Sequence, residues 1–235
     1  GKLEKVRKNM FHLDQFISQY VTKRPVSMFS ADIEANRDAL TQKIAGKSVL
    51  VIGGAGSIGS SFIKALLPFK PASLLVVDYN ENALAELTRD LRSTKGMYVP
   101  ADYIPYPMDF ASPVFEKMFR DRGGFDVVGN FSAHKHVRSE KDIYSVEALL
   151  RPRYSAFASI EVSSSRRLLT AFPPEEYFCV STDKAANPVN IMGASKRIME
   201  DVIFSYSDKF PVKTARFANV AFSNGSLPAG FLARL

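Results

Sequence analysis

A glycine-rich turn between a short apolar run and an amphipathic stretch constrains this chain more than any other feature. Residues 47–52 read KSVLVI, the segment GGAGSIGS follows, and SFIKALLPF continues at helical spacing. A continuous apolar run of this length is typical of a parallel strand that is covered on both faces. We therefore expect the chain to leave a strand, turn tightly on glycine and enter a helix.

The same alternation recurs along the chain. Further strand-like runs are SLLVVD, YIPYPMD, FDVVGNFS, EYFCVST and VKTARFANV, and helical stretches separate them. Strands that alternate with helices of roughly 10 to 16 residues predict an α/β fold with right-handed crossovers. The six strand-like runs match the number of strands in a full dinucleotide-binding sheet. The prediction is therefore a doubly wound parallel Rossmann sheet.

A different pattern precedes the first strand. Over residues 1–45, charged and apolar positions alternate at roughly helical spacing, and Pro25, Val26 and Ser27 interrupt the segment. We expect an N-terminal helical extension there, packed on the core or on a neighbouring subunit. Residues 46–235 then form the Rossmann domain.

Composition narrows the class of protein. Apolar residues make up 46% and charged residues 23% of the 235, which excludes disorder, collagen and a coiled-coil rod. No run approaches the roughly 18 apolar residues of a membrane span, and no signal peptide is visible. The single cysteine, Cys179, excludes a disulfide framework and fits a reducing compartment. These features predict a cytoplasmic protein with no membrane span.

The net charge of +7 is spread along the chain. No basic block with interleaved aromatic residues and no common nucleic-acid motif is present, so a nucleic-acid partner is not expected. A diffuse positive field suits an anionic small substrate, such as a nucleotide or phosphate ester. A merely solvated basic surface is an equally good interpretation.

The glycines of the turn form the pattern G-x-x-G-x-x-G. Gly53 permits the tight turn, Gly56 lets a pyrophosphate approach the backbone, and Gly59 allows close helix packing. The N–H groups of Ser57 and Ile58, at the start of the helix, would then face the phosphates. This arrangement predicts a dinucleotide site.

Two acidic residues end the next two strands and extend that site. Asp78 lies 19 residues after Gly59, where a carboxylate can accept both hydroxyls of a ribose. No arginine adjoins it, so a 2′-phosphate would be repelled and NAD is favoured over NADP. Asp109 could reach the adenine amino group, or it could cap the helix that begins near Ser112.

A long motif carries the strongest resemblance to a known family. Residues 180–200 read VSTDKAANPVNIMGASKRIME. This segment resembles the nucleotide-sugar 4,6-dehydratases of polysaccharide biosynthesis, in the extended branch of the short-chain dehydrogenase/reductase superfamily. The resemblance covers about residues 46–235 and includes GGAGSIGS, DYNENAL, SAHKHV and RFANVAFSNGS.

The resemblance implies an NAD-dependent UDP-N-acetylglucosamine 4,6-dehydratase, a hydro-lyase, or the same reaction on another UDP-N-acetylhexosamine. After oxidation at sugar carbon 4, Lys184 would accept the carbon 5 proton and Asp183 would protonate the departing carbon 6 hydroxyl. Thr182 would supply an orienting hydrogen bond, and Lys196 would hold the nicotinamide ribose. The acid–base properties of these side chains agree with the implied roles, because a hydroxyl, an acid and an amine at the end of a strand can exchange protons.

Met192 departs from the superfamily pattern, which places a tyrosine four residues before the lysine. A thioether has no proton to exchange, so Met192 cannot be the base that deprotonates a sugar hydroxyl. One branch of the dehydratase family has methionine there. We interpret Met192 as a packing residue at a catalytic position.

Substrate contacts are expected from two further segments. Lys135, in SAHKHV, would bind a phosphate or the sugar, although a structural role is as good an interpretation. Asn219 and Ser223, in RFANVAFSNGS, match the segment that positions the substrate beside the nicotinamide. His134 and His136 lack an evident third ligand, so no metal is expected.

Two discrepancies keep other functions open. RPRYSAFASIEVSSSRRLL stands where relatives carry an asparagine-bearing T-N-V helix start, and the chain stops at GSLPAGFLARL, before their substrate-binding region. The alternatives are a sugar-nucleotide epimerase, a C4-reductase or a non-catalytic NAD-binding scaffold. Helices expected at 139–150 and 157–171 carry apolar positions on more than one face, which predicts a homo-oligomer.

Overall fold

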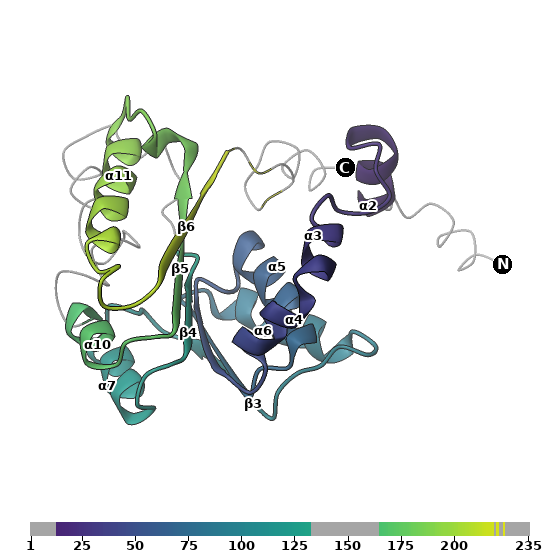
Figure 1. Ribbon diagram of the computed structural model, residues 1–235. Helices are drawn as coiled ribbons and strands as arrows, with labels where there is room; N and C mark the ends of the chain where they lie inside the picture. Colours follow the sequence, from purple (N-terminus) through teal and green to yellow (C-terminus); the bar gives the residue numbers. More distant parts are fainter. Residues whose placement is uncertain (1–12, 133–164, 219, 221–222, 224–235) are drawn as a thin grey trace. The chain divides into compact units, whose positions relative to one another are not determined.

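The computed structural model describes residues 13–132, 165–218, 220 and 223 (Figure 1). The chain divides into two compact units, Gly1–Gln42 and Lys43–Leu235. In the first unit, α2 (Leu13–Phe16) and the π-helix η1 (Ile17–Val21) precede Pro25, while α3 (Ser30–Ala35) and most of α4 (Arg37–Ile44) follow it. None of the described helices combines the length and the hydropathy needed to span a bilayer.

The second unit is built on a parallel sheet of six strands in the order β3-β2-β1-β4-β5-β6. The predicted doubly wound Rossmann sheet is thus confirmed. The order in which successive strands join the sheet reverses between β1 and β4, and open α/β sheets bind ligands at such a point. The strands are β1 (Ser48–Ile52), β2 (Ser73–Asp78), β3 (Asp102–Pro107), β4 (Val127–Asn130), β5 (Glu176–Thr182) and β6 (Val212–Phe217).

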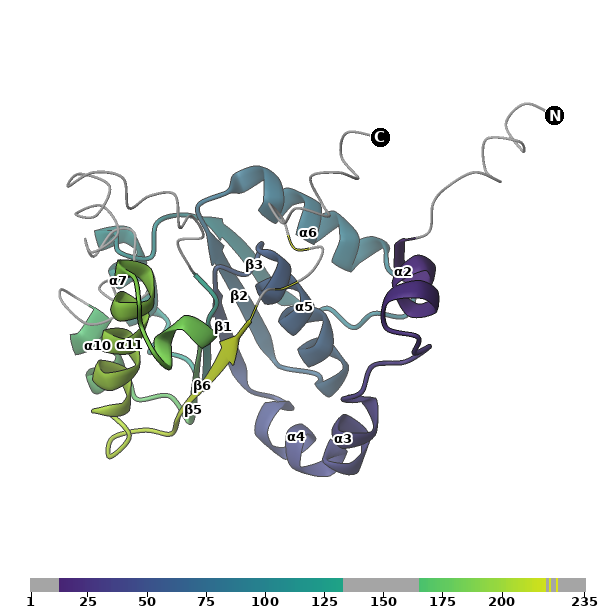
Figure 2. The same cartoon turned by 90° about the horizontal axis from the view of Figure 1, so that it is seen from above.

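Helices cover both faces of the sheet (Figure 2). Strand β1 shows why, because its side chains alternate between two cores: Val49 and Val51 pack in one cluster, and Leu50 and Ile52 in the other. Burial of each such side chain contributes roughly 1.5–3 kcal/mol. One face is covered by α5 (Ser57–Leu66), η2 (Leu67–Phe69) and α6 (Glu81–Ser93), the other by α7 (Pro113–Asp121), α10 (Ser165–Ala171) and α11 (Ile191–Phe204).

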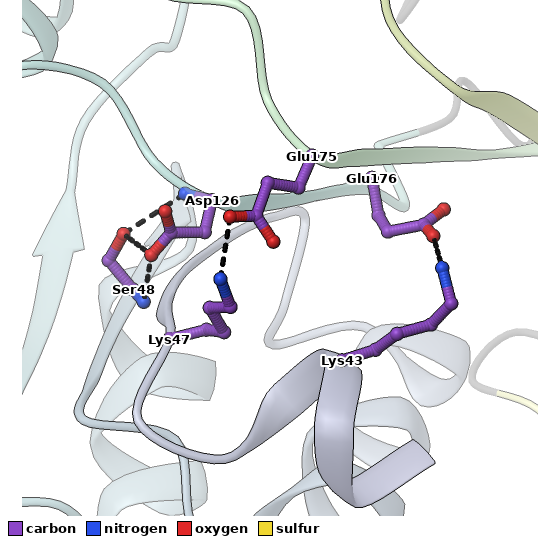
Figure 3. Close-up of polar contacts among 6 residues, drawn as sticks. All are labelled: Lys43, Lys47, Ser48, Asp126, Glu175 and Glu176. Carbon is purple, nitrogen blue, oxygen red and sulfur yellow. Dashed lines mark hydrogen bonds and ion pairs between the residues drawn. The ribbon is translucent and has the colours of Figure 1, made fainter. Parts of the chain in front are cut away.

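Polar side chains join the amino ends of the central strands (Figure 3). The N–H and the Oγ of Ser48 both donate to Asp126 Oδ2, each at 2.7 Å. Lys47 Nζ lies 2.6 Å from Glu175 Oε1, and Lys43, at the end of α4, pairs with Glu176. These contacts fix the edge of the sheet opposite the carboxyl ends, where the predicted site residues lie.

Candidate functional site

The turn after β1 is shaped by backbone contacts that only glycine allows. Gly53 has φ +71°, in the left-handed region, and a Cβ there would lie 2.6 Å from the backbone nitrogen of Ser132. A Cβ on Gly59 would lie 2.4 Å from the Gly53 carbonyl oxygen. The turn is therefore packed against the end of β4 and against the first turn of α5.

Gly56 has different surroundings. A Cβ on Gly56 would meet the Gly53 oxygen at 3.4 Å and nothing nearer, so this side of the turn is open. Gly56 is also the N-cap of α5, and no side chain caps that helix. An open turn before an uncapped helix N-terminus, where Ser57 and Ile58 begin the helix, is suited to a phosphate group.

The carboxylate of Asp78 lies beside this turn. Its Oδ2 accepts a hydrogen bond from the Ala55 N–H, and its Oδ1 accepts one from the Asn80 N–H, each at 3.1 Å. Asn80 in turn caps α6 by accepting from the Ala83 N–H. Asp78 is thus held at the carboxyl end of β2, next to the glycine turn, as the spacing predicts.

Asp109 lies beyond the end of β3, which stops two residues earlier at Pro107. Its Oδ1 accepts from the Ala111 N–H at 2.9 Å. Ser112, and not Asp109, caps α7, because the Ser112 Oγ accepts from the Phe115 N–H. The helix-cap interpretation of Asp109 is therefore wrong, and the adenine contact stays a prediction.

Thr182, Asp183 and Lys184 form a short turn at the carboxyl end of β5. Thr182 is the last residue of the strand and caps the 3-10 helix η4 (Asp183–Ala185). The Thr182 Oγ1 donates to Asp183 Oδ1 at 2.8 Å, and the Lys184 N–H donates to the same oxygen at 2.9 Å. Lys184 Nζ lies 3.5 Å from that oxygen as well. One oxygen of the Asp183 carboxylate therefore accepts hydrogen bonds from a hydroxyl and a backbone amide and also lies within ion-pair distance of an ammonium.

These contacts decide the charges of the turn. The hydrogen bond from Thr182, with help from Lys184, holds the pKa of Asp183 below its usual range. Asp183 is therefore ionised near neutral pH and forms an ion pair with Lys184. About half of the Asp183 side chain and a third of the Lys184 side chain remain exposed to solvent, so both groups are accessible.

Helix α11 is brought against this turn by two residues that the sequence analysis did not single out. Asn190 caps the helix, its Oδ1 accepting from the Gly193 N–H at 2.8 Å. A Cβ on Gly193 would lie 2.7 Å from the carbonyl oxygen of Lys184. Glycine at this position therefore lets the helix touch the turn of Thr182, Asp183 and Lys184. The signals were an asparagine cap and a glycine in the first turn.

Met192 and Lys196 lie one turn apart on α11 and are both partly buried. The Lys196 Nζ donates to the Met199 Sδ at 3.6 Å. Loss of water around the ammonium lowers the pKa of Lys196 to about 8, although Cys179 and Glu200 act in the opposite direction. Lys196 is thus close to titrating at physiological pH.

An ion pair with one buried member, Glu200, on the same helix as Lys196, was also missed. Arg216 of β6 donates from Nε to Glu200 Oε1 at 2.9 Å and from a terminal nitrogen to Oε2 at 2.6 Å. Glu200 is 3% exposed, and the Arg216 hydrogen bond lowers its pKa. The partners are 16 residues apart on different elements, so no local pattern indicated the pair.

The remaining predicted residues are placed only in part. Lys135 and Asn219, like His134 and His136, lie outside the described residues. The Ser223 Oγ donates to the Val220 carbonyl at 2.9 Å, within its own turn, and a substrate contact stays a prediction. Within the described ranges, no three His, Cys, Asp or Glu residues are grouped so that they could hold a metal ion.

Comparison with known proteins matches this unit to one family model. The model described as "Polysaccharide biosynthesis protein" matches residues 49–234. An uncharacterized membrane protein of Methanocaldococcus jannaschii is 34% identical over 77% of this chain and 51% of its own length. The capsular polysaccharide biosynthesis protein CapD of Staphylococcus aureus is 28% identical over 83% of this chain and 32% of its own length.

A more distant relative has a named reaction. A UDP-N-acetylglucosamine 4,6-dehydratase (inverting) of Campylobacter jejuni is 26% identical over 77% of this chain and 52% of its own length. The chain thus spans between about a third and about half of the curated relatives. Among solved structures, Pen from Bacillus thuringiensis aligns with a TM-score of 0.64 at 24% identity, covering 81% of this chain and 56% of that one. This structural likeness shows the fold.

Proposed function

The chain belongs to the family of polysaccharide biosynthesis proteins, and from that premise we propose that it carries the cofactor-binding and catalytic part of a nucleotide-sugar 4,6-dehydratase. The proposed substrate is UDP-N-acetylglucosamine or another UDP-N-acetylhexosamine, and the proposed cofactor is NAD. The observation that carries the proposal is the turn of Thr182, Asp183 and Lys184, held against α11 at the carboxyl edge of a dinucleotide-binding sheet.

The residues of the site fit NAD. The open side of Gly56 and the uncapped start of α5 leave room and N–H donors for a pyrophosphate. Asp78 is fixed beside that turn and can accept the hydroxyls of the adenosine ribose. The chemistry supplied by bound NAD is removal of a hydride from sugar carbon 4 and its return to carbon 6.

The ion pair of Asp183 and Lys184 must become a neutral pair before Asp183 can donate a proton and Lys184 can accept one. In the free chain the carboxyl is ionised and forms an ion pair with the Lys184 amine. When a bound sugar displaces water from the pair, the charged forms lose their solvation and the neutral forms gain by comparison. Transfer of one proton from Lys184 to Asp183, across the 3.5 Å contact, leaves a neutral amine and a carboxylic acid.

The neutral pair then balances the dehydration. Lys184 accepts the proton of carbon 5 after carbon 4 is oxidised, and Asp183 donates its proton to the carbon 6 hydroxyl, which leaves as water. When the hydride reaches carbon 6, Lys184 returns a proton to carbon 5, and the proton that the carbon 4 hydroxyl released to water at the start reprotonates the Lys184 amine. Both residues end in the charge states of the starting ion pair. Thr182, whose hydroxyl already donates to Asp183, keeps the carboxyl oriented through both proton transfers.

The names of the relatives support this reading, because the Campylobacter jejuni relative is a UDP-N-acetylglucosamine 4,6-dehydratase and the Staphylococcus aureus relative acts in capsular polysaccharide biosynthesis. The test uses a protein that continues beyond residue 235, incubated with UDP-N-acetylglucosamine. A dehydratase gives a product lighter by one water, as measured by mass spectrometry. A product of unchanged mass would indicate an epimerase and overturn the proposed reaction.

A further inference from the structure

The first compact unit of the chain exposes apolar side chains around Pro25. From residue 15 to residue 42 the structure has no buried residue, and neither η1 nor α3 contains one. The large apolar side chains that are exposed there, each between 40% and 69%, are those of Tyr20, Val21, Val26, Met28, Phe29 and Ile33. A concentration of apolar residues in water is typical of an interaction surface.

A hollow of about 350 Å³ lies within this unit. Ile17 and Thr22 line it before Pro25, and Val26, Met28 and Phe29 line it after Pro25. Two separate stretches of the chain therefore form its walls, and most of the side chains that they contribute are apolar. The volume is that of a small ligand pocket, so the hollow can receive part of another molecule.

Two cations lie at the same turn. Lys23 has φ +53°, in the left-handed region, and Arg24, the next residue, also lines the hollow. Within the part of the chain that the structure describes, neither cation lies within ion-pair distance of a carboxylate, and Glu34 of α3 is paired with Arg37. Residues 1–24 of the sequence hold six basic and two acidic residues. The charge at this turn therefore favours an anionic occupant.

We propose that the surface around Pro25 binds the face of a lipid bilayer that contains anionic phospholipids. The acyl chains contact the hollow and the exposed apolar side chains, and the phosphate groups contact Lys23 and Arg24. One phospholipid carries both hydrocarbon and an anion, so a single kind of occupant matches both parts of the surface. The contact requires neither the cofactor nor the proposed reaction.

The side chains at the turn suit such a contact. A guanidinium can bind a phosphate through two N–H donors, and the long stem of a basic residue can lie along apolar surroundings while its charge stays at the level of the headgroups. A second copy of the chain is a poorer occupant. A two-fold contact through the hollow would bring Arg24 close to the Arg24 of the other copy, and like charges repel.

Sedimentation of the full chain with lipid vesicles tests this contact. The vesicles contain phosphatidylcholine alone or phosphatidylcholine mixed with phosphatidylglycerol, and we expect binding to the mixed vesicles only. Met28→Ser combined with Phe29→Ser should weaken this binding at least about tenfold, because it removes apolar contact area. Lys23→Gln combined with Arg24→Gln should weaken it by about thirtyfold at low salt, since each basic residue near an anionic surface contributes a factor of about five.

Two control variants remove the same kinds of group elsewhere. Val114→Ser combined with Val189→Ser changes apolar residues that are 62% and 85% exposed. Arg92→Gln combined with Lys95→Gln removes two exposed cations, so the net charge changes by the same amount as in the Lys23 and Arg24 variant. Both controls should bind the mixed vesicles as the wild type does.

Several results would overturn the proposal. These are a wild type that does not bind the mixed vesicles, equal binding to both kinds of vesicle, and unchanged binding in either test variant. A lower urea midpoint in the Met28 and Phe29 variant would show that the surface packs against the rest of the chain. A smaller assembly of that variant in analytical ultracentrifugation would show that the surface contacts a second copy. Each of these two results would also overturn the contact with lipid.

Discussion

Gly56 and Gly59 lie three residues apart in one turn, yet a methyl group would meet different surroundings at each. Gly59→Ala places a Cβ 2.4 Å from the Gly53 oxygen and 2.8 Å from the Gly54 Cα, all backbone atoms. Gly56→Ala meets only ordinary contact at 3.4 Å, with φ −71° that alanine adopts freely. The first substitution strains the fold, while the second fills the space proposed for a pyrophosphate.

We therefore expect the two variants to separate stability from binding. Gly59→Ala should lower the free energy of unfolding by about 1–3 kcal/mol, as overpacking does. Gly56→Ala should keep the wild-type stability but weaken NAD binding at least about tenfold, or ~1.4 kcal/mol. Urea unfolding and calorimetry measure the two quantities. Wild-type NAD affinity in Gly56→Ala would place the pyrophosphate elsewhere.

Asp78 carries the prediction about cofactor choice. A 2′-phosphate would approach a carboxylate that is fixed by the Ala55 and Asn80 N–H groups and cannot easily turn away. NAD should therefore bind at least about tenfold more tightly than NADP, a difference of ~1.4 kcal/mol or more. Asp78→Asn should reduce the preference for NAD over NADP, because it removes the negative charge that repels the 2′-phosphate. Equal affinities of the wild type for NAD and NADP, measured by calorimetry, would contradict this role.

Residues of the site differ in how far their sequence context predicts them. Gly53, Gly59 and Asp78 could be predicted because their placement depends on local backbone geometry at a strand end. Gly193 could not, since its need for glycine comes from the Lys184 carbonyl of a different element. The Lys196 amine contacts the Met199 sulfur because of the rotamer that its side chain adopts. The spacing of residues in the sequence does not predict a rotamer.

At the scale of elements, α11 and β6 are joined by the ion pair of Glu200 and Arg216. Glu200 is buried, whereas the Arg216 side chain is 39% exposed. The two members of the pair therefore lose different amounts when their partner is removed. An exposed guanidinium is rehydrated by water, but a buried carboxylate is left without compensation.

We accordingly expect Arg216→Gln to be more destabilising than Glu200→Gln. Loss of Arg216 leaves the buried Glu200 carboxylate without its partner and should lower the free energy of unfolding by about 2 kcal/mol. This loss is smaller than that expected for a fully buried ion pair, because solvent reaches the Arg216 side of the pair. The loss in Arg216→Gln should shrink in acid, where Glu200 becomes protonated. Urea unfolding near pH 5 and near pH 8 measures both effects, and equal losses in the two variants would contradict the asymmetry.

Elements of this fold could be predicted because each buried strand forms a continuous apolar run. All six strands occur where the sequence analysis places a strand-like run, although β3 and β6, at the two edges of the sheet, are only partly buried. Boundaries were less predictable: the run YIPYPMD continues past Pro107, where β3 ends, because Asp109 and Ser112 begin a new turn before α7. Hydrophobicity indicates the strand, but local side-chain hydrogen bonds decide where it stops.

At the scale of the whole molecule, the amino edge of the sheet holds carboxylates that respond to acid (Figure 3). Burial acts to raise the pKa values of Asp126 and Glu176, but hydrogen bonds outweigh it, from Ser48 to Asp126 and from Lys213 and Lys43 to Glu176. Both pKa values are therefore lower than in the unfolded chain. The unfolded chain consequently binds more protons in acid.

The stability that these carboxylates contribute should be present above their ordinary pKa values of 3.8 and 4.5 and be lost as pH falls below them. Urea midpoints measured from about pH 6 to about pH 3 should decrease less steeply in Glu176→Gln than in the wild type. The exposed Asp121, which has no ion pair within the described residues, supplies the control Asp121→Asn. Parallel curves for the wild type and Glu176→Gln would show that this edge does not set acid stability.

The central claim is that Lys184 acts as the base of a dehydration, and deuterium incorporation at carbon 5 of the sugar tests it most directly. A protein extending beyond residue 235 is incubated with UDP-N-acetylglucosamine in deuterated water, beside its Lys184→Ala variant. NAD affinity should be the same in both, because the glycine turn and Asp78 are unchanged. Deuterium incorporation and dehydration should both fall by roughly 10²–10⁴-fold in the variant. Incorporation at the wild-type rate in Lys184→Ala would contradict the account.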